Sequence, residues 1–123
     1  MSFPEYLRHE RTRNGLGLRE LARRMSCSGA YLSRLENGWE PSPPSEDWIR
    51  RWCEKTGANF NVTVDLSGRI PSDVKRYLIE NPDVQKWIRE VLIPLNPTPI
   101  ELRRMTKYMR LQALARERGV RVG

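Results

Sequence analysis

Cysteine and histidine are scarce in this sequence. Its 123 residues include two cysteines, Cys27 and Cys53, and one histidine, His9. The cysteines lie 26 positions apart without a CxxC pair or a Cys/His ligand set, so we interpret them as small buried hydrophobic residues of a reducing cytosol. His9 has no metal-ligand spacing and no nucleophile constellation around it. The sequence therefore predicts no metal site and no enzyme.

Long apolar runs are also missing. No stretch approaches the roughly 18 consecutive apolar residues of a transmembrane helix, and no basic start followed by an apolar run indicates a signal peptide. A phosphate-binding glycine loop is absent as well, because Gly15 and Gly17 better fit a turn between helices. We therefore expect a cytoplasmic protein with no membrane partner and no cofactor.

Positive charge is present in excess, and it is unevenly distributed. The net charge is +7, of which residues 96–123 contribute +5. Such an excess favours polyanionic partners, most often nucleic acid. Apolar residues make up 38% of the chain and include four tryptophans, enough for a modest core. The length suits one compact domain or a small domain with an appended element.

Helix signals dominate the first half of the chain. A first-turn proline and Gly15 bound a predicted helix over 4–14, and apolar spacing of i, i+3, i+4 and i+7 predicts a second helix over 18–25. A tight turn follows, after which Ser28 caps a third helix that ends at Gly38. The prolines of 41–44 exclude helix, and Ser45 then caps a fourth helix that ends at Gly57.

The second half contains one ambiguous segment and three further helix starts. Residues 59–65 alternate like a strand but have no hairpin partner, so we predict a loop or irregular turn there. Caps at Ser72, Asn81 and Thr98 predict helices over 73–80, 83–92 and 99–118. Pro94, Pro97 and Pro99 are expected to separate the last helix as an arm.

The second and third predicted helices form a helix-turn-helix pattern. In this motif the second helix enters the major groove of DNA, and its N-terminal residues face base edges. The exposed first turn here is reduced to small groups, since Ser28, Gly29 and Ala30 allow close backbone approach and a methyl contact to thymine. The hydroxyl of Ser33 is also within reach of phosphates or bases.

The stretch 15–38, with "LRELA", "YLSRLENG" and the nearby Pro41-Ser42, resembles the helix-turn-helix of the xenobiotic-response-element type, which includes the lambdoid phage repressors. The likeness extends over roughly 6–68. It implies an all-α fold, a lambda-repressor-like helix-turn-helix bundle followed by a C-terminal helical extension. We accordingly expect a DNA-binding domain over 1–68 and a C-terminal helical region over 69–123.

The same resemblance implies the residues that contact DNA. Arg34 is the candidate for a bidentate guanine contact, Leu18 stands where relatives often have a phosphate-binding Gln, and Arg19 is its candidate substitute. Arg11 and Glu36 resemble a structural ion pair of the family. The predicted DNA contacts are Leu18, Arg19, Ser28, Gly29, Ala30, Tyr31, Ser33, Arg34 and Asn37.

Two departures from the family pattern stand out. Relatives often carry Lys or Arg after the Asn-Gly, whereas this chain has Trp39 and Glu40. Fewer phosphate contacts there would weaken binding and flatten its salt dependence. Gly17 also replaces the expected Ser or Thr cap of the second helix.

Apolar residues of the C-terminal third need a covering surface. They are expected to pack on the preceding helices or, as we prefer, on a second copy of the chain, which would let two recognition helices read two half-sites. The predicted dimer contacts are Trp87, Val91, Leu102, Met105, Tyr108 and Met109. Arg103, Lys107 and Arg110 follow another face of the last helix, either as a solvated surface or as an extra contact to the DNA backbone.

These patterns predict a sequence-specific double-stranded DNA-binding transcriptional regulator, a homodimeric repressor of bacterial or phage origin that occupies an operator. One alternative is an antitoxin-like or other protein-interaction module whose C-terminal helices bind a different protein. A second alternative is a scaffold that keeps the fold without reading DNA, favoured by Leu18 and Glu40 at expected phosphate positions.

Overall fold

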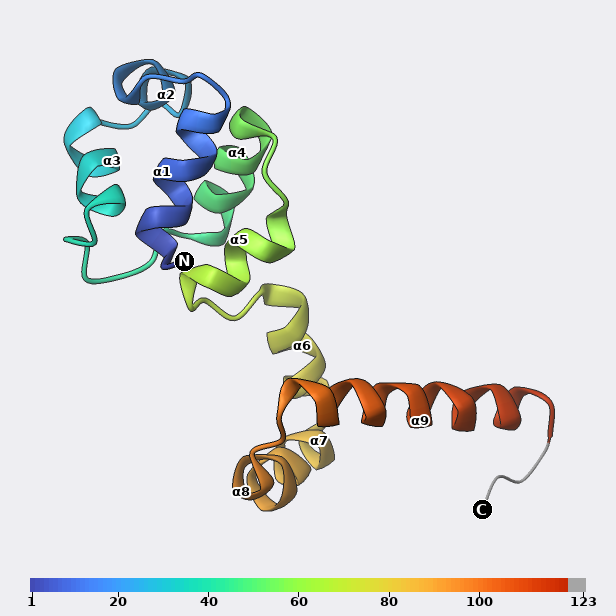
Figure 1. Ribbon diagram of the computed structural model, residues 1–123. Helices are drawn as coiled ribbons and strands as arrows, with labels where there is room; N and C mark the ends of the chain where they lie inside the picture. Colours follow the sequence, from blue (N-terminus) through green and yellow to red (C-terminus); the bar gives the residue numbers. More distant parts are fainter. Residues whose placement is uncertain (120–123) are drawn as a thin grey trace. The chain divides into compact units, whose positions relative to one another are not determined.

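The computed structural model describes residues 1–119, and all regular secondary structure in this range is helical (Figure 1). The expected all-α class is confirmed. Contacts divide the chain into two units, the first ending at Tyr77 and the second beginning at Leu78. The helices are α1 (Phe3–Arg13), α2 (Leu18–Arg24), α3 (Gly29–Glu36), α4 (Glu46–Thr56), α5 (Phe60–Ser67), α6 (Ser72–Glu80), α7 (Pro82–Trp87), the π-helix η1 (Ile88–Leu92), α8 (Ile93–Leu95) and α9 (Pro99–Glu117).

Side-chain caps start α3 and α4 where the sequence predicts them, whereas the predicted cap Ser72 is itself the first residue of α6 and its hydroxyl donates to a Glu46 oxygen at 3.1 Å. The Ser28 hydroxyl accepts a hydrogen bond from the Tyr31 amide at 3.0 Å, and Ser45 accepts one from the Trp48 amide at 3.1 Å. Each bond satisfies a free amide of the first turn. The first helix starts with a capping box that the sequence prediction missed, in which Ser2 and Glu5 bond each other's backbone amides.

The prediction of a loop over 59–65 is wrong, because residues 60–65 belong to α5 and Asn59 is its N-cap. The Asn59 side chain accepts the Val62 amide at 3.0 Å and caps the helix. Thr63 and Val64 are buried, and the Thr63 hydroxyl lies 3.0 Å from the Tyr6 hydroxyl of α1. Burial against the rest of the unit therefore overrides the strand preference of the β-branched residues.

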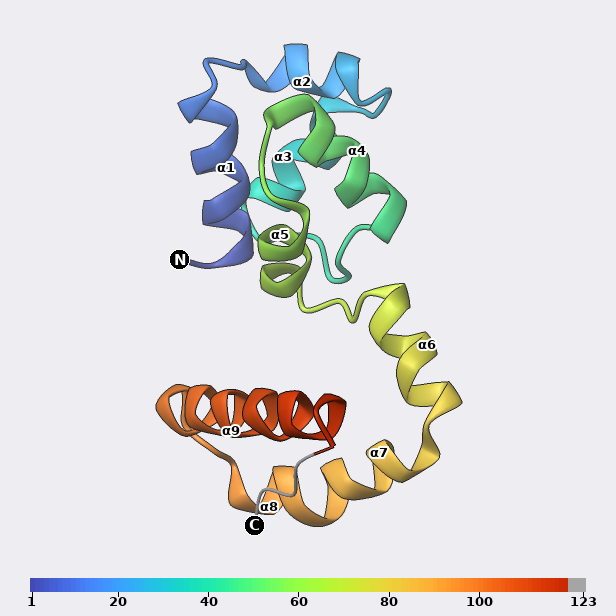
Figure 2. The same cartoon turned by 90° about the vertical axis from the view of Figure 1, so that its right-hand side faces the viewer.

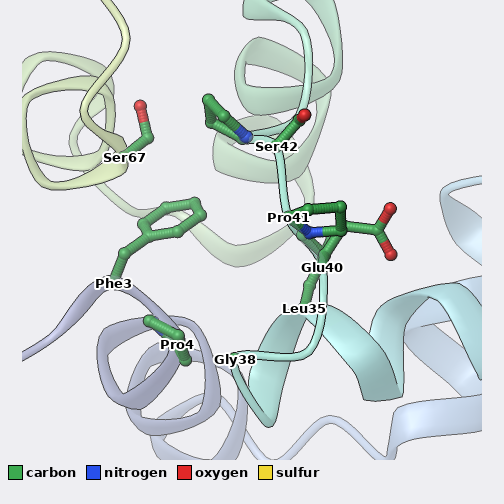
Figure 3. Close-up of a pocket in the computed structure, with 9 residues that line it drawn as sticks. Phe3, Pro4, Leu35, Gly38, Glu40, Pro41, Ser42 and Ser67 are labelled. Atoms are coloured by element: carbon green, nitrogen blue, oxygen red, sulfur yellow. The ribbon is translucent and has the colours of Figure 1, made fainter.

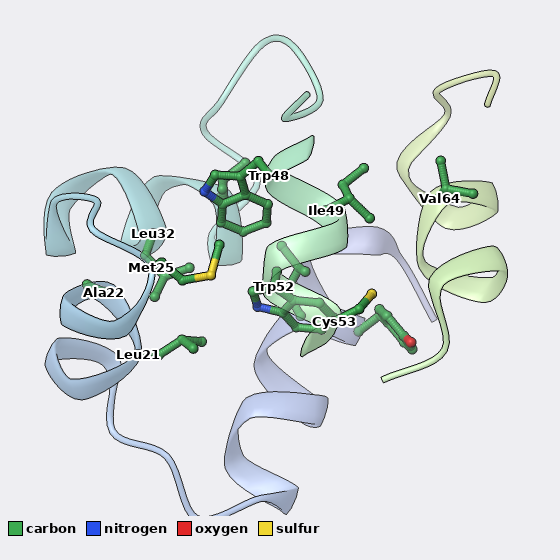
Figure 4. Close-up of a cluster of buried hydrophobic side chains, with 12 residues drawn as sticks. Leu21, Ala22, Met25, Leu32, Trp48, Ile49, Trp52, Cys53 and Val64 are labelled. Carbon is green, nitrogen blue, oxygen red and sulfur yellow. The ribbon is translucent and has the colours of Figure 1, made fainter. Parts of the chain in front are cut away.

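The core of the first unit is built by all five of its leading helices. Helix α3 packs on α1 and α2, and α5 packs on α1 and α4. Figure 4 shows the buried side chains converging, with Trp52 completely buried. This packing gives α3 a fixed inner face. The buried cluster consists of Tyr6, Leu7, Leu21, Ala22, Met25, Leu32, Leu35, Trp48, Ile49, Trp52, Cys53 and Val64.

The second unit departs from the prediction at Pro94. That proline lies inside α8 rather than separating two helices, because α7, η1 and α8 follow one another without a break (Figure 2). The π-helical segment bonds the Ile93 amide to the Ile88 carbonyl, which shifts the helical register just before a residue that lacks an N–H. Asn96, in the left-handed region at φ 43°, then ends α8.

The caps of the second unit are weaker than expected. The predicted side-chain cap from Asn81 to the first amides of α7 does not form. At α9, Thr98 accepts the Glu101 amide at 3.3 Å, so the predicted start of the last helix is confirmed. Its 19 residues make it the longest helix in the described range.

Apolar side chains of α6 to α9 remain largely uncovered. Among residues 72–119, Ala115 is the single buried residue. Trp87 is 42% exposed and Met109 is 65% exposed. No helix of residues 1–119 is long and apolar enough to cross a membrane.

Candidate nucleic-acid interface

Helices α2 and α3 form the predicted helix-turn-helix. The Cys27 amide donates to the Ala22 carbonyl at 3.0 Å, and Arg51 of α4 donates to the Met25 carbonyl at 3.1 Å, so both ends of the turn are held. Ser26 occupies the left-handed region at φ 53°, a conformation that costs a residue with a Cβ about 1–2 kcal/mol. The hydrogen bonds from Cys27 and Arg51 thus hold the turn in place, although the backbone of Ser26 is strained.

The outer face of α3 presents small groups to solvent. Leu32 and Leu35 point into the core, whereas Ser28, Ala30 and Arg34 are exposed and Gly29 and Ser33 are half-buried. The first turn carries no acidic residue. Because the Ser28 oxygen accepts its cap bond, the hydroxyl proton stays available to an acceptor on a ligand. The structure brings the predicted groove-facing residues together on one accessible helix.

Arg34 is paired in a way that spacing along α3 did not reveal. Its Nε donates to a Glu40 carboxylate oxygen at 3.0 Å, and its guanidinium lies 5.8 Å from the centre of the Tyr31 ring. Within the described part of the chain, the two terminal NH₂ groups have no hydrogen-bond partner. Glu40 therefore holds the arginine through Nε and leaves its outer fork free for a bidentate acceptor.

Glu40 comes from the proline-rich loop beside a cleft of about 220 Å³. Its carboxylate points away from Phe3 and Pro4 of that cleft (Figure 3), consistent with its ion pair to Arg34. The remaining lining carries no charged side chain. The cleft is lined by Phe3, Pro4, Leu35, Gly38, Glu40, Pro41, Ser42, Pro43 and Ser67.

Asn37 serves the structure at the end of α3. Its side-chain oxygen accepts a bond from Arg8 of α1 at 2.9 Å, and its side-chain nitrogen donates to the Ser33 carbonyl at 2.8 Å. The residue remains exposed, although both polar atoms already have partners in the chain. A phosphate contact by the Asn37 side chain would compete with these bonds.

The predicted ion pair between Arg11 and Glu36 is present. Nε of Arg11 lies 2.8 Å from one Glu36 oxygen, and its NH2 nitrogen lies 2.9 Å from the other. The Glu36 side chain is 1% exposed and that of Arg11 is 13% exposed. A bidentate pair at this depth ties α1 to α3 and leaves neither charge for a ligand.

The two α2 candidates differ in their surroundings. Leu18 is half-buried against the core, whereas Arg19 is exposed and has no ion-pair partner within residues 1–119. Glu20 binds both Arg23 and Arg24, and these hydrogen bonds lower the pKa of its carboxyl. Arg19 is therefore the available cation at the start of α2.

Tyr31 and the cysteines stay protonated at neutral pH. Burial raises the pKa of the Tyr31 hydroxyl, and the ring packs edge-on against Trp48 at 6.1 Å. Burial likewise raises the pKa of the Cys27 and Cys53 thiols. The Tyr31 O–H can donate to an acceptor, and neither thiol is a ready nucleophile.

Comparison with known proteins identifies a family over the first part of the chain. The profile of the helix-turn-helix domain family matches residues 3–65, which include all nine predicted DNA contacts. A search of curated protein sequences finds no match. One similar solved structure is the clp gene regulator ClgR from Corynebacterium glutamicum, with 22% identity, a TM-score of 0.47 and coverage of 72% of this chain and 89% of that one. Another is the SinR protein/SinI protein complex, with 16% identity, a TM-score of 0.49 and coverage of 90% and 97%. This chain belongs to the helix-turn-helix domain family.

Proposed function

We propose that this protein is a sequence-specific double-stranded DNA-binding transcriptional regulator that acts as a homodimeric repressor. The observation that carries the proposal is the outer face of α3, which is accessible, free of acidic residues in its first turn and fixed from behind by a dense core. A small, rigid helix surface of this kind fits the major groove, where base edges are distinguishable.

Each exposed group of α3 has a contact that its chemistry suits. The Ala30 methyl packs against a thymine methyl, and the free fork of Arg34 donates to O6 and N7 of guanine. Ser28, Ser33 and the protonated Tyr31 donate to phosphates or bases. Arg19 binds a backbone phosphate, and Gly29 allows the duplex to approach. No step in this account makes or breaks a covalent bond, so the proposed role is binding rather than catalysis.

The dimer is proposed from the uncovered apolar residues of the C-terminal region. Tyr108 is 57% exposed and Met109 is 65% exposed. We interpret these exposed apolar side chains as an interaction surface. A second copy covers it with the residues Trp87, Val91, Leu102, Met105, Tyr108 and Met109, so that residues 1–68 read DNA and residues 69–123 dimerise. Occupation of an operator that overlaps a promoter then represses transcription.

Selection from a random duplex pool at two salt concentrations tests this function. We expect enrichment of a two-fold symmetric site with half-sites about one helical turn apart, and light scattering should give twice the mass of one chain. Ala30→Glu should abolish enrichment by placing a carboxylate against the groove. The matched control Asn61→Glu, at an exposed position of α5, should keep it. Binding without any enriched sequence would contradict the proposal.

The same exposed surface also supports one alternative, an antitoxin-like module in which a different protein covers the C-terminal helices. A chain that stays monomeric at high concentration and dimerises neither alone nor on DNA would favour this alternative. A chain that binds no duplex at all would favour a scaffold that keeps the fold without reading DNA.

A further inference from the structure

Helix α9 carries five cations that form no ion pair within residues 1–119, and three of them share one face of the helix. Arg103, Lys107 and Arg110 are exposed, and none of them forms an ion pair within residues 1–119. Together with Thr106 and Leu111 they line a shallow recess of about 380 Å³. The Thr106 hydroxyl donates to the Leu102 carbonyl at 2.9 Å, so the cations alone supply the donors of this surface. We name these three residues the α9 stripe.

Helical geometry places the α9 stripe on one side. At 3.6 residues per turn, its members lie within an arc of about 60° and extend over about 10 Å of the helix axis. Leu102, Met105 and Met109 lie on a separate face, about 135° away. If a second copy covers that apolar face, the stripe stays open to solvent.

Arginines of the first unit are in a different electrostatic situation. Carboxylates within 4 Å neutralise many of them, including Arg34, the central member of the reading face. A helix-turn-helix that depends on its own cations would therefore have few left for phosphates. The arginines in such pairs are Arg8, Arg11, Arg13, Arg23, Arg24, Arg34 and Arg50.

We infer that the α9 stripe is a second DNA contact, which binds backbone phosphates of the duplex without reading bases. The choice of DNA as the polyanion rests on the proposed function. A DNA strand presents a phosphate about every 3.4 Å of its axis, so a stripe of about 10 Å follows roughly three phosphates. Contacts of this kind raise affinity for every sequence alike and make binding dependent on salt.

Salt dependence of binding to a random-sequence duplex tests the inference. The variant Arg103→Gln/Lys107→Gln/Arg110→Gln should reduce the slope of log K against log salt by about 2.7 per bound chain, because each phosphate contact contributes about 0.9. The control Lys75→Gln/Arg76→Gln/Lys86→Gln removes the same charge from exposed positions of α6 and α7. Its slope should change by less than about 1.

Equal slope changes in the two variants, or no change in either, would overturn the inference. Loss of binding to phosphatidylglycerol vesicles with unchanged DNA binding would also overturn it, in favour of a lipid surface. A wild-type chain that binds no duplex would remove the proposed function and this inference together. If Ala30→Glu weakens DNA binding relative to the wild type but the stripe variant does not, the inference fails and the proposed function stands. Light scattering is the check that each variant keeps its oligomeric state.

Discussion

The two ends of this chain differ in how they hide apolar surface. Helices α1 to α5 bury a continuous cluster around Trp52, whereas residues 72–119 bury one side chain, Ala115. The C-terminal helices accordingly expose large apolar side chains, including Trp87, Met109 and Leu95. The first region carries its own core, and the second needs another surface to complete one.

The two regions also differ in whether their positive charges have partners. Ion pairs neutralise most arginines of residues 1–50. The hydrogen-bond donors that remain free on α3 are few, and the fold holds them in fixed positions. The cations of α9 have no such partners in the described range. This contrast suggests a division of labour in which α3 selects the sequence and α9 contributes affinity for any duplex.

The largest expected effect breaks the core. Trp52→Ala should lower the free energy of unfolding by about 3–5 kcal/mol, because the residue is completely buried. Leu95→Ala, where the side chain is 73% exposed, should change it by less than about 0.5 kcal/mol. Urea unfolding followed by far-UV circular dichroism measures both. Similar losses in the two variants would erase the contrast between the regions.

Removing one partner of the buried ion pair should cost somewhat less. Arg11→Met leaves the Glu36 carboxylate buried without its main partner, and we expect a loss of about 3 kcal/mol. The double variant Arg11→Met/Glu36→Leu should recover most of it, because no isolated charge remains. The same urea titration applies, and a double variant as unstable as the single one would argue against this account.

A stabilising change is expected in the turn of the motif. Ser26→Gly should raise stability by about 1 kcal/mol, since glycine adopts the left-handed conformation at φ 53° without a Cβ penalty. For a domain of this size the melting temperature should rise by about 4 °C. Ser26→Ala serves as the control and should give no increase.

The smallest expected effect concerns Glu40. Glu40→Gln keeps an acceptor for the Arg34 Nε but removes a charge that repels phosphates. Affinity for any duplex should rise by up to about fivefold, since a partly exposed charge of this kind contributes about 0.2–1 kcal/mol. Fluorescence anisotropy on specific and random duplexes measures the change, and weaker binding to both would show that the carboxylate helps binding.

Much of the fold was predictable because its signals are local. Caps at Ser28 and Ser45 and the apolar spacing of 18–25 depend on neighbouring residues, and all three are confirmed. Helix α5 was missed because its stability comes from burial of Thr63 against Tyr6, far away in the sequence. Pro94 was misread because a π-helical segment accommodates it.

The candidate site was also predictable in part. The family resemblance, which extends over roughly 6–68, identified the accessible residues of α3 and the pair between Arg11 and Glu36. The bond between Arg34 and Glu40 was not foreseen, because it joins a helix to a loop across a turn and has no helical spacing. The partners of Asn37 were hidden for the same reason, since one of them is on α1.

The central claim is that α3 supplies specificity and α9 supplies general affinity. The most direct test is the ratio of affinities for the selected site and a scrambled duplex, measured for Arg34→Ala and for the triple α9 stripe variant. The account predicts that Arg34→Ala lowers this ratio by about tenfold to a hundredfold, as loss of a bidentate base contact should. The stripe variant should weaken both affinities and leave the ratio unchanged. An unchanged ratio for Arg34→Ala, or a ratio that falls in the stripe variant, would contradict it.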